Sequence, residues 1–302
     1  MFEAPNMGEM SNMSELTEKF FRAMDRARKG REFKDEAEMQ AFMNSFVGAN
    51  VDDLVASQEM SPEDRAMEWV DQAGEARTRE QAVEWLRKAL EADPGCCEAK
   101  IRLARLESRS DAEHLQRLEE AIASEETRLG PVFFKEERGH FWGMTESRPY
   151  MRACADRAWL LLELGRLVEA QKAFRAMIQL NKHDNQGIRM ILGPLCLRLG
   201  DLKAYRALRN KFKGVPDLEL LWGDVLEFFL LGDLDRAAEA RIVAREGNGH
   251  LEAYLLGHRK LPKQMPASYT WKSPEQAACA ASHLIPAWAA HPKALGWLKA
   301  TR

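Results

Sequence analysis

The stretch GHFWGMTESRPYMRA, residues 139–153, contains the most chemically versatile side chains of the sequence. His140 and Glu146 could act as a general base and the acid that orients it. With Arg148 and Tyr150 they could line a pocket, which leaves an enzyme or a small-ligand sensor as one hypothesis. No nucleophile, metal-ligand set or phosphate-binding glycine motif accompanies these residues in the sequence. We therefore predict a non-catalytic protein without a cofactor or a metal.

The charge balance gives no general attraction to polyanions. The chain has 302 residues, with 44 basic and 47 acidic side chains and a formal net charge of −3. A protein with that balance binds nucleic acid or an anionic membrane only through a local patch. The five cysteines are odd in number and form no CxxC pair, which argues against a disulfide framework or a structural zinc site.

The hydrophobic pattern predicts a soluble chain. No apolar run reaches the roughly 20 residues needed to span a bilayer. The first residues, MFEAPNMGEMSNMSEL, carry acids where a secretory signal peptide carries a basic and then an apolar stretch. We therefore expect a cytoplasmic protein with no membrane partner, and its oligomeric state stays open.

Apolar residues recur at helical spacing along almost the whole chain, which predicts an all-α fold. Two helix starts are marked by a serine followed by a proline and an acid, at Ser61 and Ser273. The predicted parts are a disordered N-terminus over residues 1–13, a helical extension over 14–58, helical repeats over 61–249 and a C-terminal helical cap over 250–302.

Three phrases repeat along the second half of the chain: LELGRLVEA at 162–170, LRLGDLKAY at 197–205 and FLLGDLDRA at 229–237. Each phrase joins two helical patterns through a Leu-Gly pair. Their glycines are Gly165, Gly200 and Gly232, so the intervals are 200 − 165 = 35 and 232 − 200 = 32 residues. A helix, a glycine turn and a second helix at a period near 34 residues resemble the tetratricopeptide (TPR) repeat.

The resemblance to TPR proteins extends to single positions. A small residue precedes a large one by four positions at Ala82 and Leu86, and again at Ala170 and Phe174. The GHFWG and RPYMRA motifs, together with LNKHDNQGIRM at 180–190, further resemble an uncharacterised bacterial TPR group with a similar signature. The resemblance implies an all-α, TPR-like helical-hairpin solenoid with an N-terminal helical extension and a C-terminal helical cap.

The spacing of these matches predicts an insertion at about residues 131–150. Ala82 and Ala170 are 170 − 82 = 88 residues apart, whereas two repeats account for about 68, which leaves about 20. Gly139 and Pro149 should break helix there, and the residue before Pro149 is expected in an extended conformation. The aromatic residues of the insertion indicate a packed joint between hairpins, and its polar residues indicate a binding site. Both interpretations stay open.

The TPR resemblance implies a concave groove, lined by the first helix of each repeat, that receives a peptide or a helix. We therefore expect a scaffold or adaptor whose partner is another protein. Tyr150 and Trp159 would anchor that partner. Arg148, Arg152 and Arg189 would pair with its acidic groups. The expected partner-binding residues are His140, Trp142, Glu146, Arg148, Tyr150, Arg152, Trp159, Asn185 and Arg189, with Asp156, Glu163 and Met190 as further groove positions.

Nucleic-acid binding is a weaker alternative. The run HRKLPK at 258–263 lies near Lys272 and the aromatic residues Tyr269 and Trp271. Interleaved cations and aromatic rings are typical of sites that bind single-stranded nucleic acid. The acidic balance of the whole chain favours a solvated loop instead, and in that case we expect the two aromatic side chains to be tucked inward.

Overall fold

The structure, a computed structural model, describes most of the chain, namely residues 18–24, 26–28, 31–48 and 60–301. Within these residues the regular elements are helices and no β-strand occurs, which confirms the all-α prediction. No helix there has the length and hydrophobicity that crossing a lipid bilayer requires. The segment expected to be disordered, residues 1–13, lies outside the described residues, as do 14–17 and 49–58 of the expected extension.

Residue contacts divide the chain into two compact units, which we describe separately. The N-terminal unit runs as far as Glu137 and also contains Phe141–Cys154. The C-terminal unit contains Arg138–His140 and the chain from Ala155 onward. The boundary falls inside one helix, so that α8 (Arg148–Glu163) contributes residues to both units.

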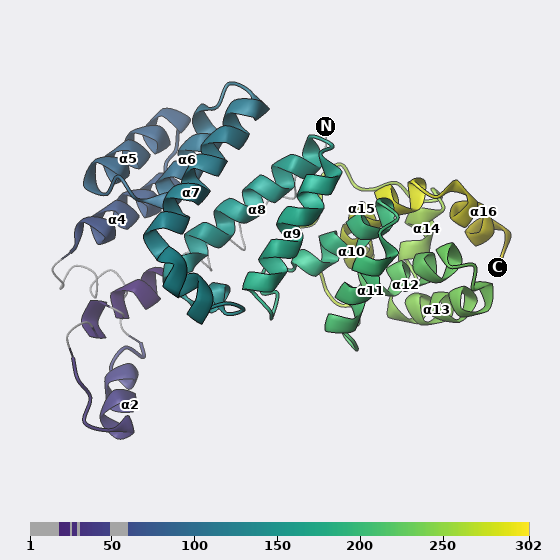
Figure 1. Cartoon of the computed structure of the whole chain (residues 1–302), viewed down its shortest axis with the longest axis horizontal. Helices are drawn as coiled ribbons and strands as arrows, with labels where there is room; N and C mark the ends of the chain where they lie inside the picture. The colour runs from purple at the N-terminus through teal and green to yellow at the C-terminus, as the bar shows by residue number, and fades with distance from the viewer. Residues whose placement is uncertain (1–17, 25, 29–30, 49–59, 302) are drawn as a thin grey trace. The chain divides into compact units, whose positions relative to one another are not determined.

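Two helical hairpins form the body of the N-terminal unit (Figure 1). Its helices are α4 (Pro62–Gly74), α5 (Arg79–Ala92), α6 (Cys97–Glu107) and α7 (Asp111–Glu136), preceded by α2 (Glu36–Asn44) and by helical residues 18–24 and 26–28, here called the N-terminal segment. α4 packs on α5, α5 on α6 and α6 on α7. The helix start predicted at Ser61 is confirmed, because its side chain accepts a hydrogen bond from the Asp64 amide and the Asp64 carboxylate accepts one in return.

Small and large residues alternate in the core of these hairpins. The buried cluster includes Ala66 and Val70 of α4, Leu86 and Ala89 of α5, and Ala99 of α6. The alanines let the helix axes approach one another, and the Leu86 side chain fills the remaining space. The local spacing of small and large residues thus accounts for the close packing of α4, α5 and α6.

The segment expected as an insertion contains more helix than the sequence indicated. α7 continues past a break at Gly130, which has φ 73° and ψ 164°, and past Pro131 as far as Glu136. Glycine adopts that positive φ without strain. Proline has no backbone N–H to donate, and at this break the helical hydrogen-bond pattern is already interrupted. The segment then forms two short 3-10 helices, η1 (Phe141–Gly143) and η2 (Thr145–Ser147).

The start of α8 corrects a second expectation. Arg148 was expected in an extended conformation because it precedes Pro149, but it has right-handed helical angles, with φ −61° and ψ −40°. α8 begins at this residue. A proline in the first turn of a helix lacks only an amide that would have no helical partner there, so the helix forms despite the local bias.

The C-terminal unit confirms a helix, a glycine turn and a second helix at all three repeated phrases (Figure 1). Its helices after α8 are α9 (Leu167–Leu180), α10 (Ile188–Arg198), α11 (Leu202–Lys211), α12 (Leu218–Leu230) and α13 (Leu234–Gly247). Gly165, Gly200 and Gly232 have φ values of 72°, 71° and 79°, in the left-handed region that favours glycine. The amide that follows each glycine donates to a carbonyl in the last turn of the preceding helix, as from Arg166 to Leu161 at 2.9 Å.

A further glycine allows α11 and α12 to approach closely. A Cβ placed on Gly223 would lie 2.9 Å from the ring of Tyr205. The Tyr205 side chain is fully buried, and its hydroxyl lies 2.9 Å from both the Leu220 carbonyl and the Asp224 carboxylate. Because the ring is held in this way, a side chain at position 223 would overpack the contact.

The C-terminal helices pack along the unit and not only at its end. They are α14 (Leu251–Leu255), α15 (Pro274–Ala289) and α16 (Pro292–Ala300). α15 contacts α10, α12 and α14, and its buried face carries Ala277, Ala281, Leu284 and Trp288. The cap expected over residues 250–302 therefore covers the first helices of two hairpins. The helix start predicted at Ser273 is confirmed, because its side chain accepts from the amide three residues later.

Candidate functional site

The aromatic residues around η1 form a packed core within the N-terminal unit. Phe141 is fully buried, with its ring centroid 5.3 Å from that of Phe133 and 5.0 Å from that of Phe134. The Tyr150 ring packs on Phe134 and Phe141, with centroids 5.3 and 6.0 Å apart. Ser147 Oγ donates to the Phe141 carbonyl at 2.6 Å, which fixes the turn between η1 and α8.

Tyr150 belongs to this buried aromatic core. Its side chain is buried, and its hydroxyl donates to Glu126 Oε1 at 2.9 Å. Burial, reinforced by Cys154 and Glu126, raises the pKa of Tyr150 above its ordinary value, so the phenol stays protonated. The ring fills the space beside Phe134 and Phe141, a contact that helical periodicity does not reveal.

Arg148 and Trp142 contact each other at the start of α8. Arg148 Nε donates to the Trp142 carbonyl at 2.9 Å, and the guanidinium carbon lies 5.7 Å from the indole centroid, within cation–π range. Arg148 Nη1 also lies 3.3 Å from Glu18 Oε1 in the N-terminal segment. The Glu146 side chain is exposed, and its backbone carbonyl accepts from Arg128 at 2.9 Å.

Arg152 lies at the centre of a network of ion pairs. Its Nε donates to Glu98 Oε2 at 2.8 Å, and its Nη1 donates to both carboxylate oxygens of Glu18 at 3.0 and 3.1 Å. Arg102 Nε donates to the other Glu98 oxygen at 3.3 Å. The side chains of Glu18 and Glu98 are only 5% and 7% exposed. We call Glu18, Glu98, Arg102, Arg148 and Arg152 the N-terminal ion cluster.

Pairing outweighs burial in this cluster. Burial alone would raise the pKa of Glu98, but Arg152 and Arg102 lower it below its ordinary value. Burial likewise opposes the charge of Arg152, and Glu98 and Glu18 raise the pKa of its guanidinium above the ordinary value. A carboxylate held between two guanidinium groups is a poor proton acceptor, so Glu98 stays ionised near neutral pH.

The N-terminal segment contacts the N-terminal unit through further ion pairs. Arg22 Nη2 lies 2.8 Å from Asp71 Oδ2, and Arg26 Nη1 lies 3.0 Å from Asp64 Oδ1. Both acids belong to α4, whereas the ion cluster belongs to α6, α8 and the segment itself. Ala23, which lies between Arg22 and Arg26 in the sequence, is fully buried. A helix of the chain thus lies on the first helices of successive hairpins and is held there by charge.

His140 belongs to the C-terminal unit and has its partners there. Lys182 Nζ, which can only donate, lies 2.8 Å from His140 Nε2, so this ring nitrogen acts as an acceptor. The rings of His140 and His183 are 6.1 Å apart, and the Lys182 amide donates to the Gly139 carbonyl at 2.9 Å. Of the residues hypothesised to line a catalytic or sensory pocket, His140, Arg148 and Tyr150 thus contact separate side-chain partners, and the Glu146 side chain is exposed.

Arg189 forms a second ion-paired site at the start of α10. Its Nη1 lies 3.0 Å from Asp184 Oδ2 and its Nε lies 2.5 Å from Asp217 Oδ2. Its guanidinium carbon lies 5.3 Å from the Phe212 ring centroid. Burial raises the pKa of Asp184, although two backbone amides and Arg189 act in the opposite direction. The charge of Arg189 is thus already matched by acids of its own unit, and Asn185 beside it is exposed.

The remaining groove candidates lie in different surroundings. Trp159 is half-buried and packs edge-to-face on Phe174 of α9, with ring centroids 5.7 Å apart and an interplanar angle of 82°. Asp156 and Met190 are half-buried and Glu163 is exposed. Trp159 therefore stabilises the α8–α9 hairpin through its contact with Phe174.

Sequence reasoning missed the acids of both sites. Glu18 and Glu98 pair with Arg152, and Asp184 and Asp217 pair with Arg189, yet only the arginines were candidates. Asp184 had a local signal, because an Asp in a DNQG turn before a helix often accepts from helical amides. It does so here from two amides, at 2.7 and 2.9 Å. The acids that pair with Arg152 had no comparable signal, since they lie 54 and 134 residues away along the chain.

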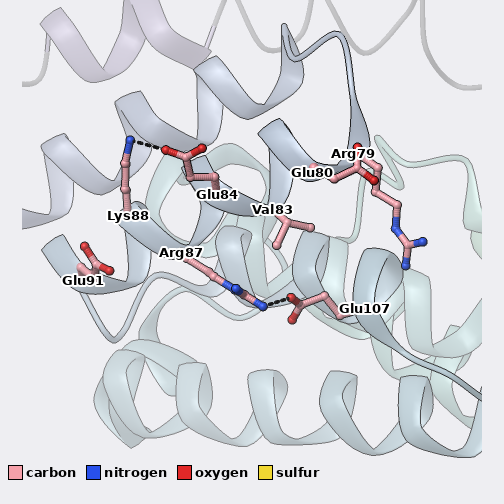
Figure 2. Close-up of a pocket in the computed structure, with 8 residues that line it drawn as sticks. All are labelled: Arg79, Glu80, Val83, Glu84, Arg87, Lys88, Glu91 and Glu107. Atoms are coloured by element: carbon pink, nitrogen blue, oxygen red, sulfur yellow. Dashed lines mark hydrogen bonds and ion pairs between the residues drawn. The ribbon is translucent and has the colours of Figure 1, made fainter.

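An open depression on α5 offers no convergent chemistry (Figure 2). It is lined by Arg79, Glu80, Val83, Glu84, Arg87, Lys88, Glu91 and Glu107. Arg87 pairs with Glu107 at 2.6 Å, and Lys88 pairs with Glu84 at 2.8 Å. Because its cations and acids pair with one another along a helix surface, we assign it no ligand.

The loop between α14 and α15 exposes its aromatic residues. Tyr269 and Trp271 are 49% and 57% exposed, so the expectation that they are tucked inward was wrong. Trp222 and Trp288 of the same unit are buried instead, with ring centroids 6.2 Å apart. The basic side chains exposed in the same loop are Arg259, Lys260, Lys263 and Lys272.

Metal and thiol chemistry have no support in the described part of the chain. No group of three or more His, Cys, Asp or Glu side chains is arranged there to hold a metal ion. Burial raises the pKa of Cys96 to about 11 and that of Cys97 further, so both thiols stay protonated near neutral pH. The chain matches no protein-family model and no curated protein sequence.

Proposed function

We propose that this chain is a non-catalytic scaffold or adaptor that binds a helical segment of another protein on the first helices of its N-terminal hairpins. The observation that carries the proposal is that α4 and α8 already hold one helix, the N-terminal segment, through three sets of ion pairs. A face that is complementary to one amphipathic helix has the shape and charge to bind another.

The repeated hairpins support this proposal. We infer a TPR-like array because successive hairpins share left-handed glycine turns at intervals of 35 and 32 residues. In such arrays the first helix of each repeat faces the ligand. α4, α6 and α8 would be the first helices of successive repeats, and they carry four of the five residues of the ion cluster.

Arg148 and Arg152 are the residues assigned to recognition of the partner. Both guanidinium groups face the carboxylate of Glu18, and Arg152 contacts its two oxygens. Arginine recognises carboxylates through this fixed, multidentate geometry, which a lysine does not reproduce. Trp142 would add apolar surface beside Arg148.

The proposal is tested by affinity capture with a quantitative comparison of variants. Arg148→Ala plus Arg152→Ala should reduce the recovery of specific partners at least tenfold relative to the wild type. The matched control is Arg87→Ala plus Arg166→Ala, which removes two arginines from exposed ion pairs. An unchanged partner set in the first variant would contradict the proposal.

A second candidate function, binding of single-stranded nucleic acid, is favoured by the exposed rings of Tyr269 and Trp271 among the basic residues of the same loop. If it holds, oligonucleotide affinity falls steeply with salt, and Arg259→Ala plus Lys260→Ala plus Lys263→Ala removes most of that salt dependence. Affinity that is absent or insensitive to salt would contradict this candidate.

A further inference from the structure

The N-terminal segment presents a single stripe of charge to the helices that hold it. Glu18, Arg22 and Arg26 follow one another at intervals of four, which places them on one face of a helix. Glu18 pairs with α8, and the two arginines pair with α4. The receiving face therefore has a fixed polarity, basic where the acid of the segment binds and acidic where its arginines bind.

The receiving face is itself charged. Asp64 and Asp71 on α4 and Arg148 and Arg152 on α8 contribute the four side chains that meet the segment. If the segment leaves, these groups exchange a protein partner for water, which solvates charge well. Apolar side chains that lose a protein partner gain no comparable stabilisation from water. The face can therefore exist without the segment at moderate cost.

Apolar burial of the segment is limited: among its described residues Ala23 is the one fully buried apolar side chain, and Phe20, Met24 and Ala27 are half-buried. Ala23 is buried, but its methyl group contributes only a small apolar area. Phe20 is half-buried and contacts Phe46, with ring centroids 6.4 Å apart, and Phe21 is 37% exposed. The segment is therefore attached mainly by its charged stripe, and its attachment is expected to be reversible.

We infer that the N-terminal segment is an internal ligand that a partner helix displaces. This inference rests on the proposed function and specifies the partner: an amphipathic helix that carries an acid and then two arginines at intervals of four. A helix with the opposite order of charges would place like charges against each other at all three positions. A partner can bind only when the internal ligand has left the face. The apparent affinity for the partner therefore falls in proportion to the fraction of chains whose face is free.

The test uses the full-length chain and a fluorescein-labelled peptide with the sequence of residues 14–30. A release variant, Arg22→Glu plus Arg26→Glu, weakens the internal ligand and leaves every residue of the receiving face unchanged. Fluorescence anisotropy should give a peptide Kd at least tenfold lower for the release variant than for the wild type. Circular dichroism and sedimentation velocity check that each chain is folded and monomeric.

Two controls make the comparison specific. The first is Arg87→Glu plus Arg166→Glu, which changes the charge equally at exposed ion pairs and should leave the Kd at the wild-type value. The second is a peptide with Glu18→Arg, Arg22→Glu and Arg26→Glu, which should bind the release variant at least tenfold more weakly. A chain with Asp71→Arg should narrow the difference between the two peptides, because it replaces one like-charge contact of the second peptide by an opposite-charge contact.

Several results would overturn the inference. Equal Kd values for the wild type and the release variant would show that the segment does not compete. Equal affinity for the two peptides would show that the charged stripe does not select the ligand. A wild-type dimer that dissociates in the release variant would mean that a second copy of this chain, and not a different protein, supplies the helix.

The proposed function fails separately from this inference. If Arg148→Ala plus Arg152→Ala abolishes partner capture but the release variant neither binds the peptide nor captures more partner, the receiving face binds a partner and the segment is only structural. That result overturns the internal ligand and leaves the scaffold function intact. If the release variant binds the peptide as expected and captures at least tenfold more partner, both are supported.

Discussion

Each unit of this chain holds one of its own helices against the first helices of its hairpins, but the two helices are attached in different ways. In the C-terminal unit α15 presents Ala281, Leu284 and Trp288 to α10 and α12, all buried. In the N-terminal unit the segment presents Glu18 and Arg22 to charged side chains of α8 and α4. The same kind of face is therefore covered by apolar packing in one unit and by ion pairs in the other.

The difference in chemistry predicts a difference in permanence. Apolar surface exposed by the loss of α15 would remain unfavourable in water, at about 25 cal/mol for each Å². Charged groups exposed by the loss of the N-terminal segment would be solvated, and that hydration offsets much of the ion pairing that is lost. We therefore regard α15 as part of the fold and the N-terminal segment as an exchangeable cover.

The largest expected effect concerns the apolar cover. Leu284→Ala should lower the free energy of unfolding by about 2 to 5 kcal/mol, because it removes a fully buried side chain and leaves a cavity. Urea denaturation followed by circular dichroism measures the change. The matched control is Leu231→Ala, at a leucine that is 57% exposed, which should change the stability by less than about 0.5 kcal/mol. Similar losses in both variants would contradict the assignment of α15 to the core.

The next effect concerns the centre of the ion cluster. Arg152→Ala leaves Glu98 and Glu18 without their main partner, and we expect a loss of about 2 to 3 kcal/mol in the free energy of unfolding. Arg166→Ala, which removes the partner of Glu169 in an exposed pair, should cost less than about 0.5 kcal/mol in the same urea titration. A loss below 1 kcal/mol for Arg152→Ala would indicate that the buried acids find other partners.

A smaller effect distinguishes the two covers directly. Arg22→Ala plus Arg26→Ala should weaken the attachment of the N-terminal segment by about 1 to 2 kcal/mol, because two partly buried ion pairs are lost. Native-state hydrogen exchange should then show faster exchange of the amides of this segment, with no change in those of α15. Equally faster amide exchange in both regions would mean that the N-terminal segment and α15 open together, which would contradict a separately exchangeable segment.

The smallest effect is a dependence on pH. The pKa of Glu98 is lowered in the folded state, so the Glu98 carboxylate stabilises the fold. Its contribution to the free energy of unfolding is fully present above the ordinary pKa of 4.5 and is lost as the pH falls through the lowered pKa. Burial raises the pKa of Asp71 in the folded state. The contribution of Asp71 to the free energy of unfolding is therefore present at low pH and declines as the pH rises above 3.8. The stability difference between wild type and Glu98→Gln should therefore shrink between pH 7 and pH 3 in urea titrations. A constant difference would show that the carboxylate charge is not involved.

The elements that could be predicted from the sequence depend on local physics. Left-handed glycines at Gly165, Gly200 and Gly232 and the N-cap serines Ser61 and Ser273 act within one or two helical turns, and each was located correctly. The same signal recurs at Gly257, with φ 74°, where it ends α14. Such features can be predicted from the sequence because the residue type and the backbone conformation that it favours belong to the same few positions.

The candidate site depends on contacts between distant residues, and most of it could not be predicted. Arg152 was identified as a cation on a helix, but its partner Glu18 is 134 residues away and carries no motif. The burial of Tyr150 could not be predicted, because an aromatic residue in a polar stretch has the same appearance whether it faces solvent or a core. The exposure of Trp271 was missed because an indole by itself favours burial, and the side that it faces is set by residues distant in the sequence.

The tryptophan pair between α12 and α15 gives the detachment of α15 an optical signal. Within the described residues, the buried indole N–H groups of Trp222 and Trp288 find no hydrogen-bond acceptor, and their rings meet edge-to-face. Indoles in so dry a setting emit at short wavelength and shift to the red on contact with water. The N-terminal segment contains no tryptophan. Intrinsic fluorescence should therefore report the detachment of α15 as a red shift of these two indoles, whereas exchange of the N-terminal segment involves no tryptophan of the segment itself.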